Sequence, residues 1–249
     1  GSIFSAMIIA GVFCVAVIDA PMTLALENAS GVHGAAGQLV RTQLPSGFFP
    51  YDFNFSTGAQ SDMRYMKGFN LVRQTGAAFG LAEYYSAFPG KDTQQALEKF
   101  LQQVSSSSLP IGKSLPQQLL ENSRLYNRWQ LWQILRKPLY KAGLLFSKVG
   151  DGKVVAVDGD YERAWSGATA LSLLTAVKYY SATGDAQFND DIQFWKNGLS
   201  ALHVPGRGFR EAPHYLTESA YVNGEAWLAL AEYLRVFPGD LEARNFLQE

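Results

Sequence analysis

The chain has 249 residues, of which 47% are apolar, so it can bury one substantial core and is interpreted as one folded domain. Its 21 basic and 22 acidic residues leave a formal net charge of -1, which gives no electrostatic basis for binding nucleic acid. The single cysteine, Cys14, and the three histidines provide no cluster with zinc-ligand spacing, so we expect no metal and no cofactor.

The N-terminal segment is apolar, and residues 3–18 carry no charge. This run is shorter than the roughly 20 residues that a membrane-spanning helix requires, so it suits the core of a signal peptide or a packed helix. We therefore divide the chain into an N-terminal segment, residues 1–29, and a helical domain, residues 30–249. If the segment is a signal or an anchor, the protein is periplasmic or secreted, with membrane association through this segment.

Three later segments share one plan, in which a glycine near the start is followed by an apolar helix and a final glycine. They span residues 72–90, 164–184 and 221–239. Apolar and small residues lie on nearly every side of these segments, which predicts inner helices surrounded by other helices. The first two segments are much further apart than the last two, so we expect a divergent copy over residues 129–140.

Amphipathic segments follow the inner helices, at residues 96–104 and 188–202, and these predict outer helices with one wet face. Between inner and outer helices, a glycine precedes an aspartate at residues 90–92, 184–185 and 239–240. This pattern predicts a tight connection in which an N-capping aspartate follows the glycine that ends the inner helix.

Short extended excursions precede the inner helices, at residues 45–51, at residues 149–155, where we expect a hairpin, and at residues 205–209. Each joins an outer helix to the next inner helix, so all three should gather at one end of the assembly. We expect the binding site there. The fold class predicted is all-α, with repeated αα-hairpins forming a closed or open α/α toroid whose last unit is incomplete.

Three motifs carry a resemblance to a known superfamily. They are Gly-Phe-Phe-Pro-Tyr-Asp at residues 47–52, Asn-Leu-Val-Arg-Gln-Thr-Gly at residues 70–76 and Tyr-Val-Asn-Gly-Glu-Ala at residues 221–226. Over residues 30–249 the chain resembles the α/α-toroid carbohydrate-active proteins, nearest to D-glucuronyl C5-epimerase-like and N-acylglucosamine 2-epimerase-like domains. The resemblance implies the architecture and a polysaccharide or oligosaccharide partner, but it does not choose among epimerases, lyases and glycoside hydrolases.

The candidate catalytic residues are Glu225, Tyr221 and His214. Glu225 lies at the start of the third inner helix, where burial would raise its pKa into the range of acid/base catalysis. A glutamate in a first helical turn also complements the helix dipole, which is the structural alternative. His214 is equally interpretable as a surface residue, and Tyr221 as a residue at the edge of the core.

The candidate substrate-binding residues combine an arginine fork, hydrogen-bonding side chains and aromatic rings that stack on sugars. They are Asp52, Asn70, Arg73, Tyr161, Trp165 and Arg210. For Arg73, pairing with a structural acid or capping of a neighbouring helix is the alternative interpretation.

From these residues we expect a protein that acts on an acidic, uronate-containing polysaccharide by epimerisation or cleavage. Both reactions begin with removal of a proton beside a carboxylate, which requires a base and a cationic clamp. Two alternatives remain open at this point: a non-catalytic glycan-binding scaffold for polysaccharide assembly or export, and an α-solenoid that binds other proteins.

Overall fold

The computed structural model describes most of the chain, with the backbone alone for residues 22–30 and Tyr161. The described residues are 22–52, 54, 56–62, 64, 70–111, 151–204, 206–213, 215 and 217–248. Helix accounts for 62%, with seven α-helices and two small sheets in this part, so the predicted all-α class is confirmed. No helix within these ranges combines the length and apolarity needed to cross a bilayer.

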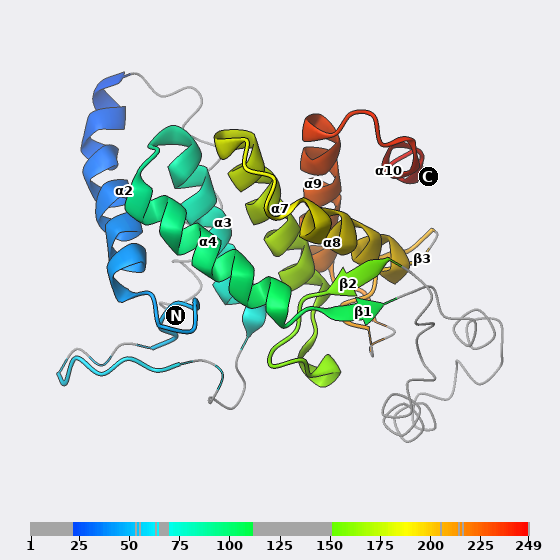
Figure 1. The fold of residues 1–249 in the computed structure, drawn as a ribbon, viewed down its shortest axis with the longest axis horizontal. Coiled ribbons are helices and arrows are strands. Elements are labelled where there is room, and N and C mark those ends of the chain that lie inside the picture. Colours follow the sequence, from blue (N-terminus) through cyan, green and yellow to red (C-terminus); the bar gives the residue numbers. More distant parts are fainter. Residues whose placement is uncertain are drawn as a thin grey trace.

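Three inner helices run parallel, side by side, and are called the inner row (Figure 1). They are α3 (Leu71–Ala87), α7 (Ser166–Thr183) and α9 (Ala220–Val236), close to the predicted bounds. The middle helix, α7, packs directly against both α3 and α9. Every residue of α7 from Ser166 to Val177 is buried, as expected for a helix with small and apolar side chains on all sides.

Four outer helices cover the inner row (Figure 1). They are α2 (Met22–Thr42), α4 (Lys91–Ser106), α8 (Asn189–Leu202) and α10 (Leu241–Phe246). Helices α4 and α8 fall on the predicted amphipathic segments, and α4 buries Leu97, Phe100 and Leu101 completely. The period of the apolar residues therefore located these two helices correctly.

Each inner helix bonds to the outer helix that precedes it through a tyrosine fourteen residues after its N-cap. The Tyr84 hydroxyl lies 2.7 Å from His33 Nδ1 of α2. The Tyr179 hydroxyl donates to Glu98 of α4 at 2.8 Å, and the Tyr233 hydroxyl accepts from Gln193 of α8 at 2.9 Å. The same position thus joins an outer helix to an inner helix three times, at the C-terminal end of the inner row.

The two sheets are antiparallel pairs of very short strands. Strands β3 (His203–Val204) and β4 (Gly208–Phe209) form the extended excursion predicted near residue 205. Strand β2 (Gly152–Val154) pairs with β1 (Leu109–Ile111), so the hairpin predicted within residues 149–155 is wrong. Strand β1 follows α4 and strand β2 precedes α7, so the two paired strands are distant in sequence.

The divergent copy predicted over residues 129–140 lies outside the described residues. Among the elements that are described, α7 is the next inner helix after α3, because the two pack directly against each other. Ile111 pairs with Gly152, so the two ends of the intervening stretch lie side by side.

One of the three predicted aspartate caps is confirmed. Asp240 caps α10 by accepting a hydrogen bond from the Ala243 amide at 2.9 Å. Asp92 lies inside the first turn of α4, which begins at Lys91, two residues earlier than a cap at Asp92 would allow. Asp185 instead accepts from the Gln187 amide at 3.0 Å, and α8 begins only at residue 189, because a turn separates it from the end of α7. A side-chain hydrogen bond within that turn competes with capping.

Two glycines allow β2 to lie directly on α8. A Cβ atom at Gly152 would stand 2.9 Å from the Gly198 amide nitrogen and 2.8 Å from the Ile111 carbonyl oxygen. A Cβ atom at Gly198, inside α8, would overlap the Lys153 carbonyl oxygen. Glycine is otherwise unfavourable within a helix, so this close backbone contact is its physical reason.

We predict that Gly198→Ala lowers the free energy of unfolding by about 2–4 kcal/mol, because the new methyl group meets fixed backbone atoms. Gly34→Ala in α2 is the matched control, since a Cβ atom there meets nothing within 4 Å. It should raise stability by up to about 1 kcal/mol through helix propensity. Chemical denaturation of both variants checks this, and equal effects would show that the β2 contact on α8 is not tight.

Candidate functional site

The three loops that precede the inner helices meet at the N-terminal end of the inner row. Each is attached to its helix by the same contact, in which a backbone amide donates to the side chain four residues after the N-cap. The donors and acceptors are Phe49 and Gln74 at 2.8 Å, Val155 and Thr169 at 2.9 Å, and Phe209 and Asn223 at 2.7 Å. The acceptors are three different residue types, so sequence comparison within the chain did not reveal the equivalence.

The loops also contact one another. The Arg163 guanidinium donates to the Arg64 carbonyl oxygen at 3.4 Å, which joins the first loop to the second. The second loop meets the third where the Ser166 amide donates to the Glu211 carbonyl oxygen at 3.0 Å. The excursions expected to gather at one end therefore do so, and they frame the ends of α3, α7 and α9.

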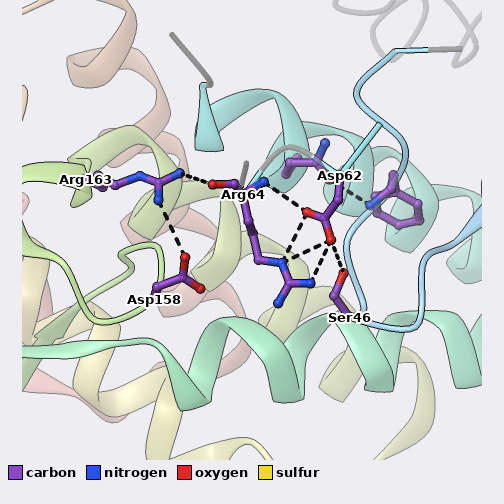
Figure 2. A network of polar contacts seen from close by, with 7 residues as sticks. Ser46, Asp62, Arg64, Asp158 and Arg163 are labelled. Atoms are coloured by element: carbon purple, nitrogen blue, oxygen red, sulfur yellow. Dashed lines mark hydrogen bonds and ion pairs between the residues drawn. The ribbon is translucent and has the colours of Figure 1, made fainter. Parts of the chain in front are cut away.

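A network of charged side chains fixes the first loop against the second (Figure 2). The Arg64 guanidinium donates to both oxygens of Asp62, the shortest contact being 2.7 Å, and Ser46 adds a weaker hydrogen bond at 3.4 Å. Arg163 pairs with Asp158 at 3.5 Å. Burial would raise the pKa of Asp62, but its contacts with Arg64 outweigh that effect and hold the pKa below its usual value. The network is therefore a support for the loops and not a candidate acid or base.

Arg73 lies at the start of α3 with its side chain exposed. Its guanidinium donates to the Tyr51 hydroxyl at 2.9 Å and lies 5.5 Å from the centre of that ring. Its contacts in the described part of the chain include no carboxylate, so the alternative of a structural ion pair has no support there. The phenol orients the guanidinium, whose remaining donors can reach a ligand carboxylate.

Trp165 is the N-cap residue of α7 and stacks on Tyr215 of the third loop, with ring centres 5.9 Å apart and an angle of 24° between the planes. Both side chains are half-buried. Paired aromatic rings that keep exposed surface provide the flat apolar face against which sugar rings pack.

Glu225 belongs to the second turn of α9 and is half-buried. Within the described part of the chain its carboxyl group has neither a hydrogen-bond donor nor an ion-pair partner. Burial raises the pKa of Glu225 to about 7. A carboxyl group with this pKa exchanges a proton readily near neutral pH, which is what general acid/base catalysis requires.

Gly167 makes room for the Glu225 carboxyl group at the start of α7. A Cβ atom at Gly167 would overlap Glu225 Oε2 and would lie 3.4 Å from Val72 of α3. The carboxyl group therefore lies where all three inner helices meet, close to the N-terminus of α7. The sequence analysis selected Glu225 from its place on α9 but gave no sign of this contact with α7.

The other predicted site residues have mixed surroundings. The Asn70 side chain caps α3 by accepting from the Val72 amide at 2.9 Å, which leaves its amide group as the part that could meet a ligand. Tyr221 lies one turn before Glu225 and is 79% exposed. Asp52 is exposed on the first loop, whereas Arg210 is only 3% exposed. The predicted role of Arg210 in substrate binding stays a prediction.

Two predicted residues cannot be placed in the site. His214 lies outside the described residues. Tyr161 belongs to a short 3-10 helix, η2 (Tyr161–Arg163), of which only the backbone is described at that position. Their proposed roles therefore stay predictions.

The sequence analysis left out Tyr51, Tyr215 and Gly167 as site residues. Tyr51 lies in the excursion predicted at residues 45–51, and Tyr215 lies between the excursion predicted at residues 205–209 and the third inner helix, so a rule that selects every aromatic residue before an inner helix would have found them. Gly167 gave no separate signal, because a glycine near a helix start is also common for packing reasons.

The described part of the chain contains no group of three or more His, Cys, Asp or Glu side chains arranged to hold a metal ion. Comparison of the chain with protein-family models, with curated proteins and with solved structures finds no match in any of the three. The chemistry of this site is therefore argued from its own residues.

The raised pKa of Glu225 makes a prediction about stability. The folded state disfavours the ionised form of this carboxyl group. Stability is therefore lost as the pH rises from 4.5, the ordinary pKa of a glutamate, to about 7, the pKa in the folded state, and the loss persists above that pH. Glu225→Gln should therefore raise the free energy of unfolding by about 1–3 kcal/mol near pH 8 and by much less near pH 4.

Denaturant unfolding across this pH range measures the effect. Glu242→Gln is the control, because that side chain is 83% exposed and pairs with Lys196 only at 4.0 Å, so its effect near pH 8 should be far smaller than that of Glu225→Gln. A Glu225→Gln variant that is less stable than the parent near pH 8 would show that the carboxylate is stabilised by the start of α7.

Proposed function

We propose that this chain is a carbohydrate-active enzyme that acts on an acidic, uronate-containing polysaccharide by epimerisation or cleavage at the uronate. In this proposal the inner row and its outer helices belong to an α/α toroid, closed or open. The contacts that recur at equivalent positions of α3, α7 and α9 support a repeated helix pair.

The observation that carries the proposal is the half-buried carboxyl group of Glu225, which has no partner among the described residues and lies at the end of the inner row where the loops meet. Structural glutamates that are removed from water normally have a partner, because an unpaired buried charge is unfavourable. Active sites often keep a buried carboxyl group without a partner, although such a group is unfavourable for the stability of the folded state.

The surroundings of Glu225 suit a charged sugar. Arg73 offers a guanidinium to a carboxylate, and the stacked rings of Trp165 and Tyr215 offer an apolar face to a pyranose ring. Tyr221, exposed on the same side of α9 as Glu225, supplies a phenol that can exchange a second proton. These groups lie on different helices at the same end of the row.

The proposed chemistry starts with transfer of the proton on the carbon beside the substrate carboxylate to ionised Glu225. The electron pair of the broken C–H bond spreads onto the substrate carboxylate, which Arg73 stabilises. In epimerisation a proton returns to the opposite face of that carbon. In cleavage the electron pair forms a double bond to the neighbouring carbon, and the glycosidic oxygen leaves that carbon with a proton.

Export to the periplasm or the medium belongs to the same proposal, because polysaccharides of this kind are substrates outside the cytoplasm. It rests on the apolar run at residues 3–18, which has the character of a signal peptide. The test is the size and N-terminal sequence of the protein secreted from a cell that expresses the full gene, and retention in the cytoplasm would contradict it.

We predict that Glu225→Gln lowers turnover of uronate oligosaccharides by about a hundredfold or more, because the amide keeps the size of the side chain but cannot transfer a proton. Incubation in deuterated water measures the first step directly, since both reactions exchange the carbon-bound proton with solvent. Mass spectrometry reads the exchange, and the absorbance of an unsaturated product distinguishes cleavage from epimerisation.

Full exchange by a folded Glu225→Gln variant would remove Glu225 from the reaction. If the parent protein binds uronate oligosaccharides but exchanges no proton, the better function is a non-catalytic glycan-binding scaffold. The aromatic stack of Trp165 and Tyr215 is the observation that favours that second candidate, because it needs no acid or base to bind sugar.

We predict that Arg73→Ala weakens binding of uronate oligosaccharides by about 10-fold to 100-fold, the range of one charge-assisted contact. Arg73→Lys should recover only part of the affinity, because lysine lacks the bidentate fork. Isothermal titration against acidic and neutral oligosaccharides of equal length checks both variants. Arg41→Ala, which removes an exposed arginine of α2, controls for net charge, and an equal loss toward neutral sugars would contradict a carboxylate clamp.

A further inference from the structure

The outward side of α9 is an apolar helix face that no described element covers. Its residues Gly224, Leu228 and Ala231 are exposed, and 48% of the Leu228 surface is accessible. We call these three residues the open face of α9. Tyr221 and Arg235 border it and are exposed as well.

The corresponding positions of the other inner helices are covered. These positions lie five, nine and twelve residues after the N-cap residues Asn70, Trp165 and Ser219. In α7 they are Ala170, Leu174 and Val177, all at 0% exposure, and in α3 they are Thr75 (0%), Ala82 (1%) and the half-buried Phe79. Each inner helix therefore presents this face to the next helix of the row, and α9 alone among the described inner helices leaves it uncovered.

Helix α3, the first helix of the row, also has an uncovered face, at positions that are buried in α7 and α9. Three and ten residues after the N-cap, α7 has Ala168 and Thr175 and α9 has Val222 and Ala229, and all four are buried. At the same two positions α3 has Arg73 and Gly80, which are exposed. We call Arg73 and Gly80 the open face of α3.

The open face of α9 uses the positions five, nine and twelve residues after the N-cap, and the open face of α3 uses the positions three and ten residues after it. Both sets of positions are buried in α7, where neighbouring helices pack within the row. Helices α3 and α9 both pack against α7, and the positions of Thr75 and Ala82 on α3 and of Ala229 on α9 are buried within the row. A Cβ atom at Gly80 or Gly224 would meet nothing within 4 Å, so packing among the described residues does not explain a glycine at either helix position. A helix that approaches closely would explain both.

We propose that the open face of α9 docks against the open face of α3 in a second copy of this chain, so that two copies related by a two-fold axis continue each other's inner row. The second copy is the occupant because this chain itself carries the complementary face. Two such contacts, one at each end, close the pair without leaving an uncovered face.

The charges near the junction fit this arrangement. Thirteen residues after the N-caps, Lys178 of α7 lies between Glu83 of α3, at 2.8 Å, and Glu232 of α9, at 3.8 Å. At the new junction Glu232 would face the second copy's Glu83, and a cation is needed there. Arg235 borders the open face of α9 and already pairs with Glu232 at 2.9 Å, so it can take the place that Lys178 has inside the row.

The docking would also change the composition of the proposed active site. The docking proposal itself does not depend on the proposed function. Within one chain α3 and α9 each pack against α7, and Val72, next to Arg73, lies near the Glu225 carboxyl group. Across the junction, Arg73 of the second copy would lie on the helix directly beside α9. The pair would then hold two sites, each with residues from both copies.

Mass photometry and sedimentation of the protein over a range of concentrations test the proposal. A mass of two chains is expected. Leu228→Arg on the open face of α9 and Gly80→Arg on the open face of α3 should each weaken the pair at least tenfold, because each places a charge in both contacts. Gln102→Arg, exposed on α4, is the matched control and should leave the mass unchanged.

Mixing distinguishes this contact from other dimers. A mixed pair contains one Leu228→Arg chain and one Gly80→Arg chain. In this pair the unaltered α9 of the Gly80→Arg chain meets the unaltered α3 of the Leu228→Arg chain, so the mixture should form pairs that neither variant forms alone. Circular dichroism of each variant checks that it is folded. A monomer at every concentration overturns the proposal, as does a dimer that both substitutions leave intact or that mixing fails to restore. Because the measurement is a mass and not an activity, its failure leaves the proposed function standing.

Discussion

The structure depends on the burial of α7 between α3 and α9. Its residues from Ser166 to Val177 are all buried, so every side of this helix is packed against the rest of the chain. Small side chains bring the neighbouring helices close, and the hydrophobic effect then fixes three parallel helices as one layer. Once these helices are parallel, their N-terminal ends must lie together, and so must the loops that lead into them.

The two ends of the inner row are stabilised by different chemistry. At the C-terminal end, Tyr179 donates to Glu98 and Asp185, and Tyr233 donates to Asp240 and contacts Gln193. Burial and these acidic partners raise the pKa of both phenols, so they stay protonated and hold short connections in place. The hydroxyl groups of Tyr84, Tyr179 and Tyr233 at that end all have partners, which leaves them little capacity to bind a ligand.

The N-terminal end differs because its loop amides have hydrogen-bond partners and the Glu225 carboxyl group has none among the described residues. Backbone amides of the loops bond to Gln74, Thr169 and Asn223, and these contacts make the frame rigid. Inside this frame the Glu225 carboxyl group has no partner among the described residues, and burial raises its pKa. A rigid frame around an unfavourable group is the arrangement that a reacting site requires, since the frame prevents the group from relaxing into solvent.

The sequence by itself determined the all-α class, the approximate bounds of α3, α4, α7, α8 and α9, and the common end of the three loops. These features follow from apolar periodicity and from glycine and proline positions, which act over a few residues. It also pointed to Glu225 and Arg73, because their residue types and their places near helix starts carry chemical meaning.

Only the tertiary structure decided which groups those side chains meet. The pairing of β1 with β2, the contact of Gly167 with Glu225 and the stacking of Trp165 on Tyr215 all join residues far apart in the chain. Local patterns contain no information on such distant partners. The equivalence of Gln74, Thr169 and Asn223 was hidden for a related reason: a backbone amide can donate to any side-chain oxygen at the right distance, so the geometry of the contact recurs while the residue type does not.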